Sequence, residues 1–110
     1  CRTAGDCKIT FGTGAFLLSV AGNGRPSTGE LLPTIAWQMQ GAPAVFAIEG
    51  GVYDAGAAVE WARKIGLYAE NAELDCFEGP SAIRRGLVFV PAFSGLAAPY
   101  WDRHAAPLFI

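Results

Sequence analysis

A threonine between two glycines, Gly12-Thr13-Gly14, separates two apolar stretches near the beginning of the sequence. Glycine has no Cβ, so the backbone N–H groups of such a turn can point outward toward a small anion such as phosphate. The threonine hydroxyl would add one more donor. The same residues also suit an ordinary tight hairpin, which needs glycine for its dihedral angles. The local sequence by itself favours the ordinary hairpin and leaves phosphate binding as the functional alternative.

A second glycine-rich segment, Glu49-Gly50-Gly51, leads into a predicted helix that carries Gly56 in its first turn. Glycine inside a helix costs roughly 0.5–1 kcal/mol relative to alanine, so its presence there needs a physical reason. One reason would be the close approach of a ligand phosphate to the positive end of the helix dipole. The other would be close packing of the helix against a strand. The sequence alone favours neither.

The remaining polar and aromatic motifs are less specific. Residues 90–102 (VPAFSGLAAPYWD) could form a ligand-binding loop or a rigid packed one, and packing is favoured. The three cysteines form no CxxC pair and His104 is the single histidine, so no zinc site or Cys–His dyad is predicted. An odd number of cysteines suits the reduced thiols of an intracellular protein.

The elements that position these motifs follow from the hydrophobic pattern, which predicts a helix over residues 54–66. The apolar residues there recur with the spacing of one helix face: Ala58, Trp61, Ala62 and Ile65. Asp54 is the expected N-cap and Gly66 the expected C-terminal stop. Glu60 and Lys64 are spaced i,i+4, so their charges are expected to attract each other.

Uncharged runs rich in β-branched and aromatic residues, bounded by glycine and proline, predict strands. We expect strands at residues 8–11, 15–21, 31–40, 44–49 and 87–93, with another beginning at 108–110. Residues 12–14 and 41–43 would make hairpins of the first two pairs, and the acidic residues 68–80 suit a short solvated helix and loop. This order predicts an α/β or α+β fold, with antiparallel strands followed by a helix packed on one face of the sheet.

The composition limits the function classes. The chain of 110 residues has 52% hydrophobic and 16% charged residues and a net charge of −2, which suits one domain or less with a buried core. The lack of excess positive charge argues against a nucleic-acid partner. Charges near the N-terminus argue against a targeting segment, and Cys1 in place of a starting Met suggests a chain cut from a longer one. The longest uncharged run, residues 31–48, contains prolines and glutamines and does not suit a membrane-spanning helix.

Three segments of the chain together resemble the glycerol kinases, which belong to the FGGY carbohydrate kinases. They are residues 11–16 (FGTGAF), 49–61 (EGGVYDAGAAVEW) and 91–102 (PAFSGLAAPYWD), in the order and spacing of that family. The resemblance implies two actin-like domains of the ribonuclease H fold, with ATP and a polyol in the cleft between them. Residues 1–110 would form the N-terminal part of the second, C-terminal domain: an incomplete ribonuclease-H-like (actin-like ATPase) domain of the α/β class.

The resemblance also implies roles for individual residues. The expected contacts to ATP lie at the hairpin and the helix start: Gly12, Thr13, Gly14, Gly56 and Glu60. Thr13 would touch the transferred phosphate, Gly56 would lie near the nucleotide phosphates, and Phe16 would pack on the glycerol carbons. Glycerol kinases usually carry glutamine at the position of Glu60. A carboxylate there would be repelled by the phosphates unless it is protonated, bridged by magnesium or turned away.

The implied activity is the ATP-dependent phosphorylation of glycerol to glycerol 3-phosphate, with Mg²⁺, in a cytoplasmic enzyme expected to be a homo-oligomer. The family's catalytic base is an aspartate in a Gly-Asp-Gln motif upstream of this chain, so no catalytic residue and no metal ligand is expected within it. The chain would need the missing N-terminal kinase domain to be active. Two alternatives stay open: another FGGY sugar kinase of the xylulokinase or gluconokinase type, and a non-catalytic actin-like nucleotide-binding fragment.

Overall fold

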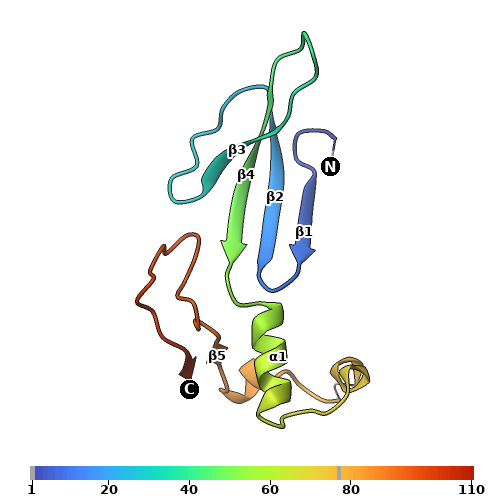
Figure 1. Ribbon diagram of the computed structural model, residues 1–110, viewed down its shortest axis with the longest axis vertical. Coiled ribbons are helices and arrows are strands. Elements are labelled where there is room, and N and C mark those ends of the chain that lie inside the picture. Colours follow the sequence, from blue (N-terminus) through green and yellow to red (C-terminus); the bar gives the residue numbers. More distant parts are fainter. Residues whose placement is uncertain (1, 77) are drawn as a thin grey trace.

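The computed structural model describes residues 2–76 and 78–110, which contain strands, one α-helix and two 3₁₀ turns (Figure 1). The strands are β1 (Cys7–Phe11), β2 (Ala15–Gly22), β3 (Leu32–Trp37), β4 (Val45–Val52), β5 (Phe89–Val90) and β6 (Leu108–Phe109). The helix is α1 (Gly56–Lys64), and the 3₁₀ turns are η1 (Asn71–Asp75) and η2 (Ala82–Arg85). The predicted strands and helix are therefore present with shifted ends, whereas η2 lies outside the predicted elements.

The first four strands form one antiparallel sheet in the order β1-β2-β4-β3. Strand β4 therefore lies between β2 and β3, and its C-terminal end reaches the turn between β1 and β2. Ala15, the first residue of β2, pairs with Phe11 of β1 and with Val52 of β4. This register places the tip of the β1–β2 hairpin next to the point where the chain leaves β4 for the helix.

The strand ends differ from the predicted ones for local reasons. Strand β4 continues three residues past its predicted end, to Val52, because these residues pair with residues 15–17 of β2. Strand β3 stops at Trp37 because the chain turns at Met39, whose carbonyl accepts a hydrogen bond from the N–H of Ala42. The predicted strand at 87–93 shortens to β5, since Pro91 has no N–H with which to continue the ladder.

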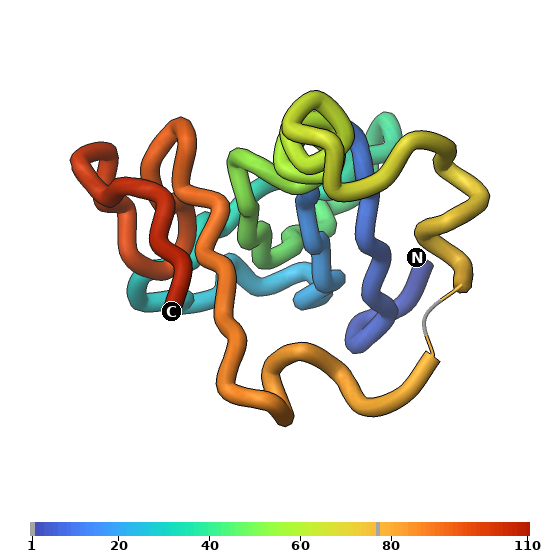
Figure 2. The backbone as a smooth tube through the Cα atoms, turned by 90° about the horizontal axis from the view of Figure 1, so that it is seen from below, coloured from blue at the N-terminus to red at the C-terminus, as the bar shows by residue number. Residues whose placement is uncertain are grey.

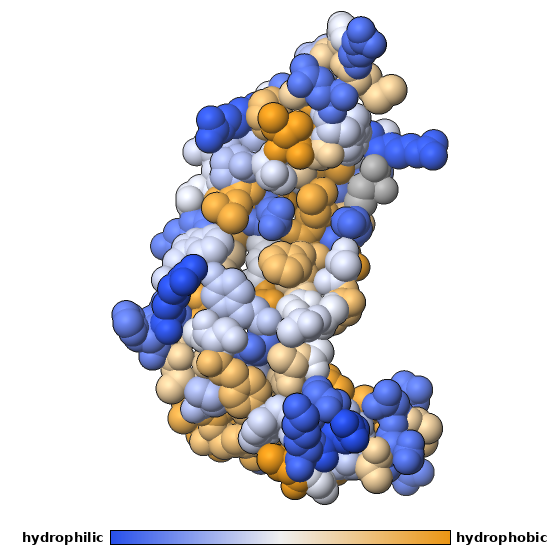
Figure 3. Space-filling view, in the orientation of Figure 1, coloured by the Kyte–Doolittle hydropathy of each residue, from blue (hydrophilic) through white to orange (hydrophobic). Residues whose placement is uncertain are grey.

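The buried core lies in the middle of the sheet and within the loop of residues 91–102. Val20 and Ala47 pair across β2 and β4 and are 3% and 0% exposed. In the described part of the chain, Ala92 and Ala97 are the other buried apolar residues. Many large apolar side chains remain exposed, and Figure 3 shows apolar residues among the polar ones at the surface. The buried positions are thus occupied mostly by small side chains, which let backbones approach closely.

Helix α1 lies beyond the end of the sheet and not on its face, which corrects the predicted packing (Figure 1). Only residues 53–55 separate β4 from α1, so the chain has no length in which to turn back over the sheet. Seen from below in Figure 2, the helix is viewed nearly along its axis. Its N-terminal turn, rather than its apolar side, therefore faces the sheet.

The apolar side of α1 packs instead on the C-terminal segment. Trp61 stacks on Phe89 with ring centroids 5.2 Å apart, and its ring lies at the same distance from Phe93. Phe89 in turn stacks on Phe109 across the β5–β6 pair, with centroids 4.2 Å apart. These aromatic contacts hold the end of the chain against the helix.

The predicted C-terminal stop of α1 is confirmed, whereas the predicted N-cap is wrong. Gly66 follows the helix with a φ of +80°, as a glycine stop requires. Asp54, however, is not the N-cap, because Ala55 occupies that position and no side chain caps the helix. The Asp54 carboxylate is turned toward Ser94, so the first N–H groups of the helix must find other acceptors.

Candidate functional site

The acceptors for the start of α1 are carbonyl groups at the tip of the β1–β2 hairpin. The N–H groups of Ala55 and Ala57 donate to the carbonyl of Thr13 over 2.9 and 3.0 Å. The N–H of Gly56 donates to the carbonyl of Gly12 over 3.0 Å. We call this set of three hydrogen bonds the hairpin–helix joint. Because it uses these three N–H groups, they are not free to bind an anion.

Two glycines are required by the close approach at this joint. A Cβ added to Gly56 would collide with the carbonyl oxygen of Gly12. A Cβ added to Gly14 would lie 2.6 Å from the carbonyl oxygen of Val52. Of the two explanations for Gly56, the structure therefore supports close packing, but against a hairpin tip and not along a strand.

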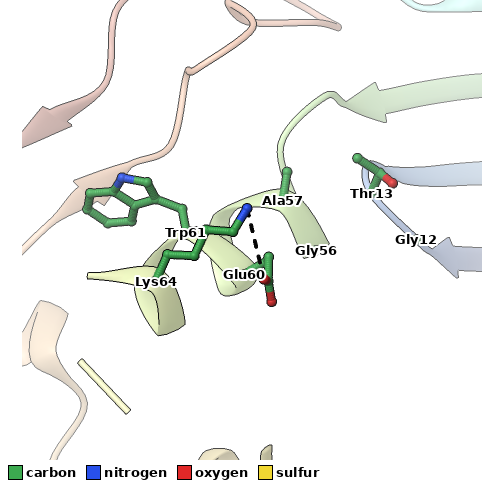
Figure 4. Close-up of a pocket in the computed structure, with 7 residues that line it drawn as sticks. All are labelled: Gly12, Thr13, Gly56, Ala57, Glu60, Trp61 and Lys64. Atoms are coloured by element: carbon green, nitrogen blue, oxygen red, sulfur yellow. Dashed lines mark ion pairs between the residues drawn. The ribbon is translucent and has the colours of Figure 1, made fainter. Parts of the chain in front are cut away.

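The hairpin tip and the first turns of α1 line one cavity of about 540 Å³ (Figure 4). Its lining residues are Gly12, Thr13, Gly56, Ala57, Glu60, Trp61 and Lys64. Four of the predicted ATP contacts, distant in sequence, thus surround the same hollow. Gly14 lies beside it, under the end of β4, and is not part of the lining.

The hairpin tip beside this cavity carries backbone and side-chain hydrogen-bond donors. Among the residues described, the N–H groups of Thr13 and Gly14 and the hydroxyl of Thr13 make no hydrogen bond. Three unpaired donors on one turn can surround the oxygens of a phosphate group. The predicted phosphate contact is therefore compatible with the hairpin, even though the helix N-terminus itself is occupied.

Glu60 is held by basic residues of its own helix. Its carboxylate accepts hydrogen bonds from Arg63, from Nε over 3.0 Å and from Nη2 over 2.7 Å. The Nζ of Lys64 lies 4.0 Å from Oε1 (Figure 4). The hydrogen bonds from Arg63 lower the pKa of the Glu60 carboxyl below its ordinary value. In the absence of a bound anion Glu60 is therefore ionised at neutral pH.

Three lining residues were not among the predicted ligand contacts: Ala57, Trp61 and Lys64. Lys64 contributes a positive charge to the rim, and its side chain is 70% exposed. Its spacing from Glu60 indicated an ion pair but gave no sign of a ligand site. Trp61 belongs to the predicted apolar helix face, and one edge of this packed residue lines the cavity. The sequence could not show that Trp61 lies at the edge of this cavity.

Phe16 does not line the same cavity. It lies on β2 opposite Thr10 and is 46% exposed. Its ring borders a separate hollow of about 380 Å³ on the sheet, together with Lys8, Thr10, Leu18 and Glu49. A Cβ added to Gly51 would lie 3.0 Å from the ring, so the glycine makes room for it. The predicted polyol contact thus stands on a different surface from the predicted phosphate contacts.

Metal ligands do not gather in the part of the chain that is described. No group of three or more His, Cys, Asp and Glu residues is placed there to hold an ion. Cys7 and Cys76 are exposed free thiols, and His104 is exposed. Within the same residues, no helix is long and apolar enough to cross a bilayer.

Comparison with known sequences supports the expected relationship. The chain matches the family described as "FGGY family of carbohydrate kinases, C-terminal domain" over residues 7–110. It is 48% identical over 104 residues to a glycerol kinase of Thermus brockianus, a match that covers 93% of this chain and 21% of that protein. A glycerol kinase of Citrifermentans bemidjiense is 43% identical over 107 residues. The chain therefore spans about a fifth of the length of these relatives.

Solved structures show the same fold. Glycerol kinase of Plasmodium falciparum with ADP superposes with a TM-score of 0.80 and 34% identity, covering 97% of this chain and 22% of that one. A ligand-bound xylulose kinase of Lactobacillus acidophilus superposes with a TM-score of 0.72 and 25% identity, covering 94% and 21%. These matches confirm a mixed α/β class with an antiparallel sheet. On this agreement of sequence and fold, the chain belongs to the FGGY family of carbohydrate kinases, as part of their C-terminal domain.

Proposed function

We propose that the full-length protein containing this chain is an ATP-dependent glycerol kinase that forms glycerol 3-phosphate. Residues 1–110 would be the N-terminal part of its C-terminal domain. The observation that carries the proposal is the cavity between hairpin and helix, in which Thr13 stands with unpaired donors. The high identity to relatives named glycerol kinases supports glycerol as the acceptor.

In phosphoryl transfer a protein contributes mainly positioning and charge stabilisation. In our proposal the N–H groups of Thr13 and Gly14 and the Thr13 hydroxyl hold oxygens of the transferred phosphate. These donors sit on a turn fixed by β-sheet pairing on one side and by the hairpin–helix joint on the other. A donor that is held in place before the reaction needs no reorganisation during it.

The helix residues would act on the nucleotide side of the cavity. Gly56 has no Cβ, so α1 can approach the hairpin closely. Gly12 provides the carbonyl against which Gly56 lies. Glu60 would contact ATP while Arg63 offsets its negative charge. Lys64, held only loosely at 4.0 Å from Glu60, leaves the rim with an excess positive charge that favours phosphate.

The remaining parts of the reaction would be supplied outside these residues. Mg²⁺ would neutralise phosphate charge, and it prefers phosphate oxygens, water and a few carboxylates as ligands. Glu60, the carboxylate at the cavity, is engaged by Arg63, so the described residues do not form a magnesium site. The proposal places the catalytic base in the N-terminal kinase domain. Phe16 would pack on the glycerol carbons from the neighbouring hollow. The full-length enzyme is proposed to be a cytoplasmic homo-oligomer.

A coupled assay of ADP release with the full-length protein tests the substrate. Glycerol, xylulose, ribulose and gluconate are offered at equal concentration with ATP and Mg²⁺. We expect kcat/KM to be highest for glycerol by at least about a hundredfold, since a mismatched polar substrate leaves groups of the site unpaired. Turnover of xylulose without turnover of glycerol would assign the protein to the sugar kinases of the family.

A further inference from the structure

Asp54 is a buried charged side chain at the junction between β4 and α1. It is 5% exposed, and among the described residues it is the one buried polar or charged group. Its carboxylate accepts a hydrogen bond of 2.7 Å from the backbone N–H of Ser94 and one of 3.0 Å from the Ser94 hydroxyl. A buried carboxylate is costly unless its oxygens are paired, so the position of Asp54 depends on Ser94.

The loop that carries Ser94 holds α1 at a second point. The ring of the preceding residue, Phe93, lies 5.2 Å from the ring of Trp61, which lines the cavity. The loop is itself anchored, because Ala92 and Ala97 are 1% and 5% exposed. Two neighbouring loop residues therefore hold the helix. Ser94 bonds Asp54, just before the helix begins, and Phe93 contacts Trp61 in its second turn.

The hairpin–helix joint begins one residue after Asp54. Ala55 donates its N–H to Thr13, and Gly56 touches the carbonyl of Gly12 with no room for a Cβ. A shift of Asp54 must therefore move the start of α1 relative to the hairpin. The cavity has these two elements as its walls, so its shape follows from the position of the junction.

We propose that Asp54 is a positioning residue for nucleotide binding, which fixes the start of α1 against the hairpin through its hydrogen bonds to Ser94. The inference rests on the proposed function, because it assigns a support to the same cavity. Residues 91–102 would then act by packing, and this packing would affect the ligand site indirectly by holding α1 in place. The hollow beside Phe16 has no contact with this junction, so the effect is confined to the nucleotide side.

The test uses the full-length protein with Asp54→Ala, Asp54→Asn, Ser94→Ala and the Asp54→Ala/Ser94→Ala double variant. Asp6→Asn is the matched control, because the Asp6 carboxylate also accepts two hydrogen bonds, from the N–H groups of Arg2 and Thr3. That turn precedes β1, at the other end of the sheet from the hairpin tip (Figure 1). The readouts are KM for ATP, KM for glycerol and the Kd of ADP by calorimetry.

We expect Asp54→Ala to raise KM for ATP and the Kd of ADP about tenfold, the usual effect of losing hydrogen bonds to a charged group. KM for glycerol should change by less than about twofold. Ser94→Ala should give a smaller effect in the same direction, and Asp54→Asn an intermediate one, since it keeps one acceptor. The double variant should resemble Asp54→Ala alone, because partners in one contact are not additive.

Equal changes in both KM values would overturn the inference, as would an effect in Asp6→Asn of the same size. If Asp54→Ala fails to fold, Ser94→Ala decides, because it removes only the hydroxyl bond; an unchanged Kd for ADP would then refute the role. The proposed function fails separately, if the wild-type protein binds ADP but phosphorylates no polyol. In that case the Kd of ADP in the variants still decides the role of Asp54.

Discussion

Thr13 differs from its glycine neighbours in adding a side-chain donor to the backbone donors of the hairpin tip. The N–H groups of residues 13 and 14 would remain after any substitution of the threonine other than proline, so the hydroxyl can be tested alone. Its proposed partner is the phosphate in transfer, whose charge is redistributed in the transition state. An interaction of this kind affects turnover more than ground-state binding.

We therefore predict that Thr13→Ala in the full-length protein lowers kcat by about ten- to a hundredfold, as for the loss of one donor in a preorganised site. KM for glycerol should stay within about twofold, and Thr13→Ser should keep most of the activity because it retains the hydroxyl. Steady-state kinetics with both substrates measure these changes. An unchanged kcat would remove the side chain from phosphate binding.

Glu60 poses a question of charge, because its carboxylate stays ionised beside a proposed polyphosphate. Arg63 lowers its pKa, so the carboxyl gains a proton only well below neutral pH. Since the folded pKa is the lower one, any contribution of this pair to stability is present at neutral pH and lost in acid. The pair is exposed, and solvent screens it.

We predict that Glu60→Gln lowers KM for ATP by about two- to threefold, because it removes a negative charge and frees Arg63. The gain should shrink in high salt, and the dependence of KM on pH between about 6 and 8 should be the same in both proteins. Glu30→Gln is the control for the same change of charge elsewhere. A rise in KM after Glu60→Gln would show that the carboxylate itself assists binding.

At the scale of elements, the hairpin–helix joint is made by backbone groups and tightened by glycine. The helix meets the hairpin with its N-terminal turn, and its donors reach the carbonyls of Gly12 and Thr13. A hydrogen-bonded joint of this kind takes the place of the side-chain cap that α1 lacks. Its geometry leaves no space at Gly56.

We predict that Gly56→Ala destabilises the protein by about 1–3 kcal/mol, because the added methyl forces the helix from the hairpin. It should also raise KM for ATP, since the cavity walls move apart. Denaturation in urea gives the free energy of unfolding. Gly24→Ala is the control, because nothing lies within 4 Å of its added Cβ, and it should be nearly neutral. Equal stabilities of the two variants would contradict the steric argument.

The elements themselves could be predicted largely from local signals. Glycines at 12 and 14 marked the first hairpin, and the spacing of Trp61 and its apolar neighbours marked α1. The position of α1 beyond the sheet depends on the short connection at residues 53–55 and on strand order, which local pattern does not determine. The partner of Asp54 lies forty residues later, at Ser94, so capping was the only local use that the sequence suggested for the carboxylate.

At the scale of the whole molecule, the residues predicted for ATP and the one predicted for glycerol fall on two surfaces. The cavity at the hairpin–helix joint is lined by Glu60 and Lys64 among others, whereas the hollow beside Phe16 lies on the sheet. The resemblance suggested both contacts. It could not show that they belong to two separate hollows. A substrate that reacts with ATP would have to reach the hairpin tip from the side of Phe16.

We predict that ADP raises the thermal unfolding midpoint of the full-length protein by a few degrees at a concentration about a hundredfold above its Kd. Adenosine at the same concentration should have a much smaller effect, because it lacks the phosphates that the helix side of the cavity, with Gly56 and Lys64, is proposed to receive. Differential scanning calorimetry measures both shifts. An equal shift with adenosine would place the binding energy on the base and sugar and not at this cavity.

Because the hairpin–helix joint consists of main-chain groups, it does not depend on the identity of the side chains at positions 13, 55 and 57. Combinatorial libraries at the two cavity-lining positions, 13 and 57, could therefore alter what the hollow accepts while the scaffold around it persists. New preferences for the phosphate donor should be accessible there through few changes, and the glycines at 14 and 56 would be the residues to leave untouched.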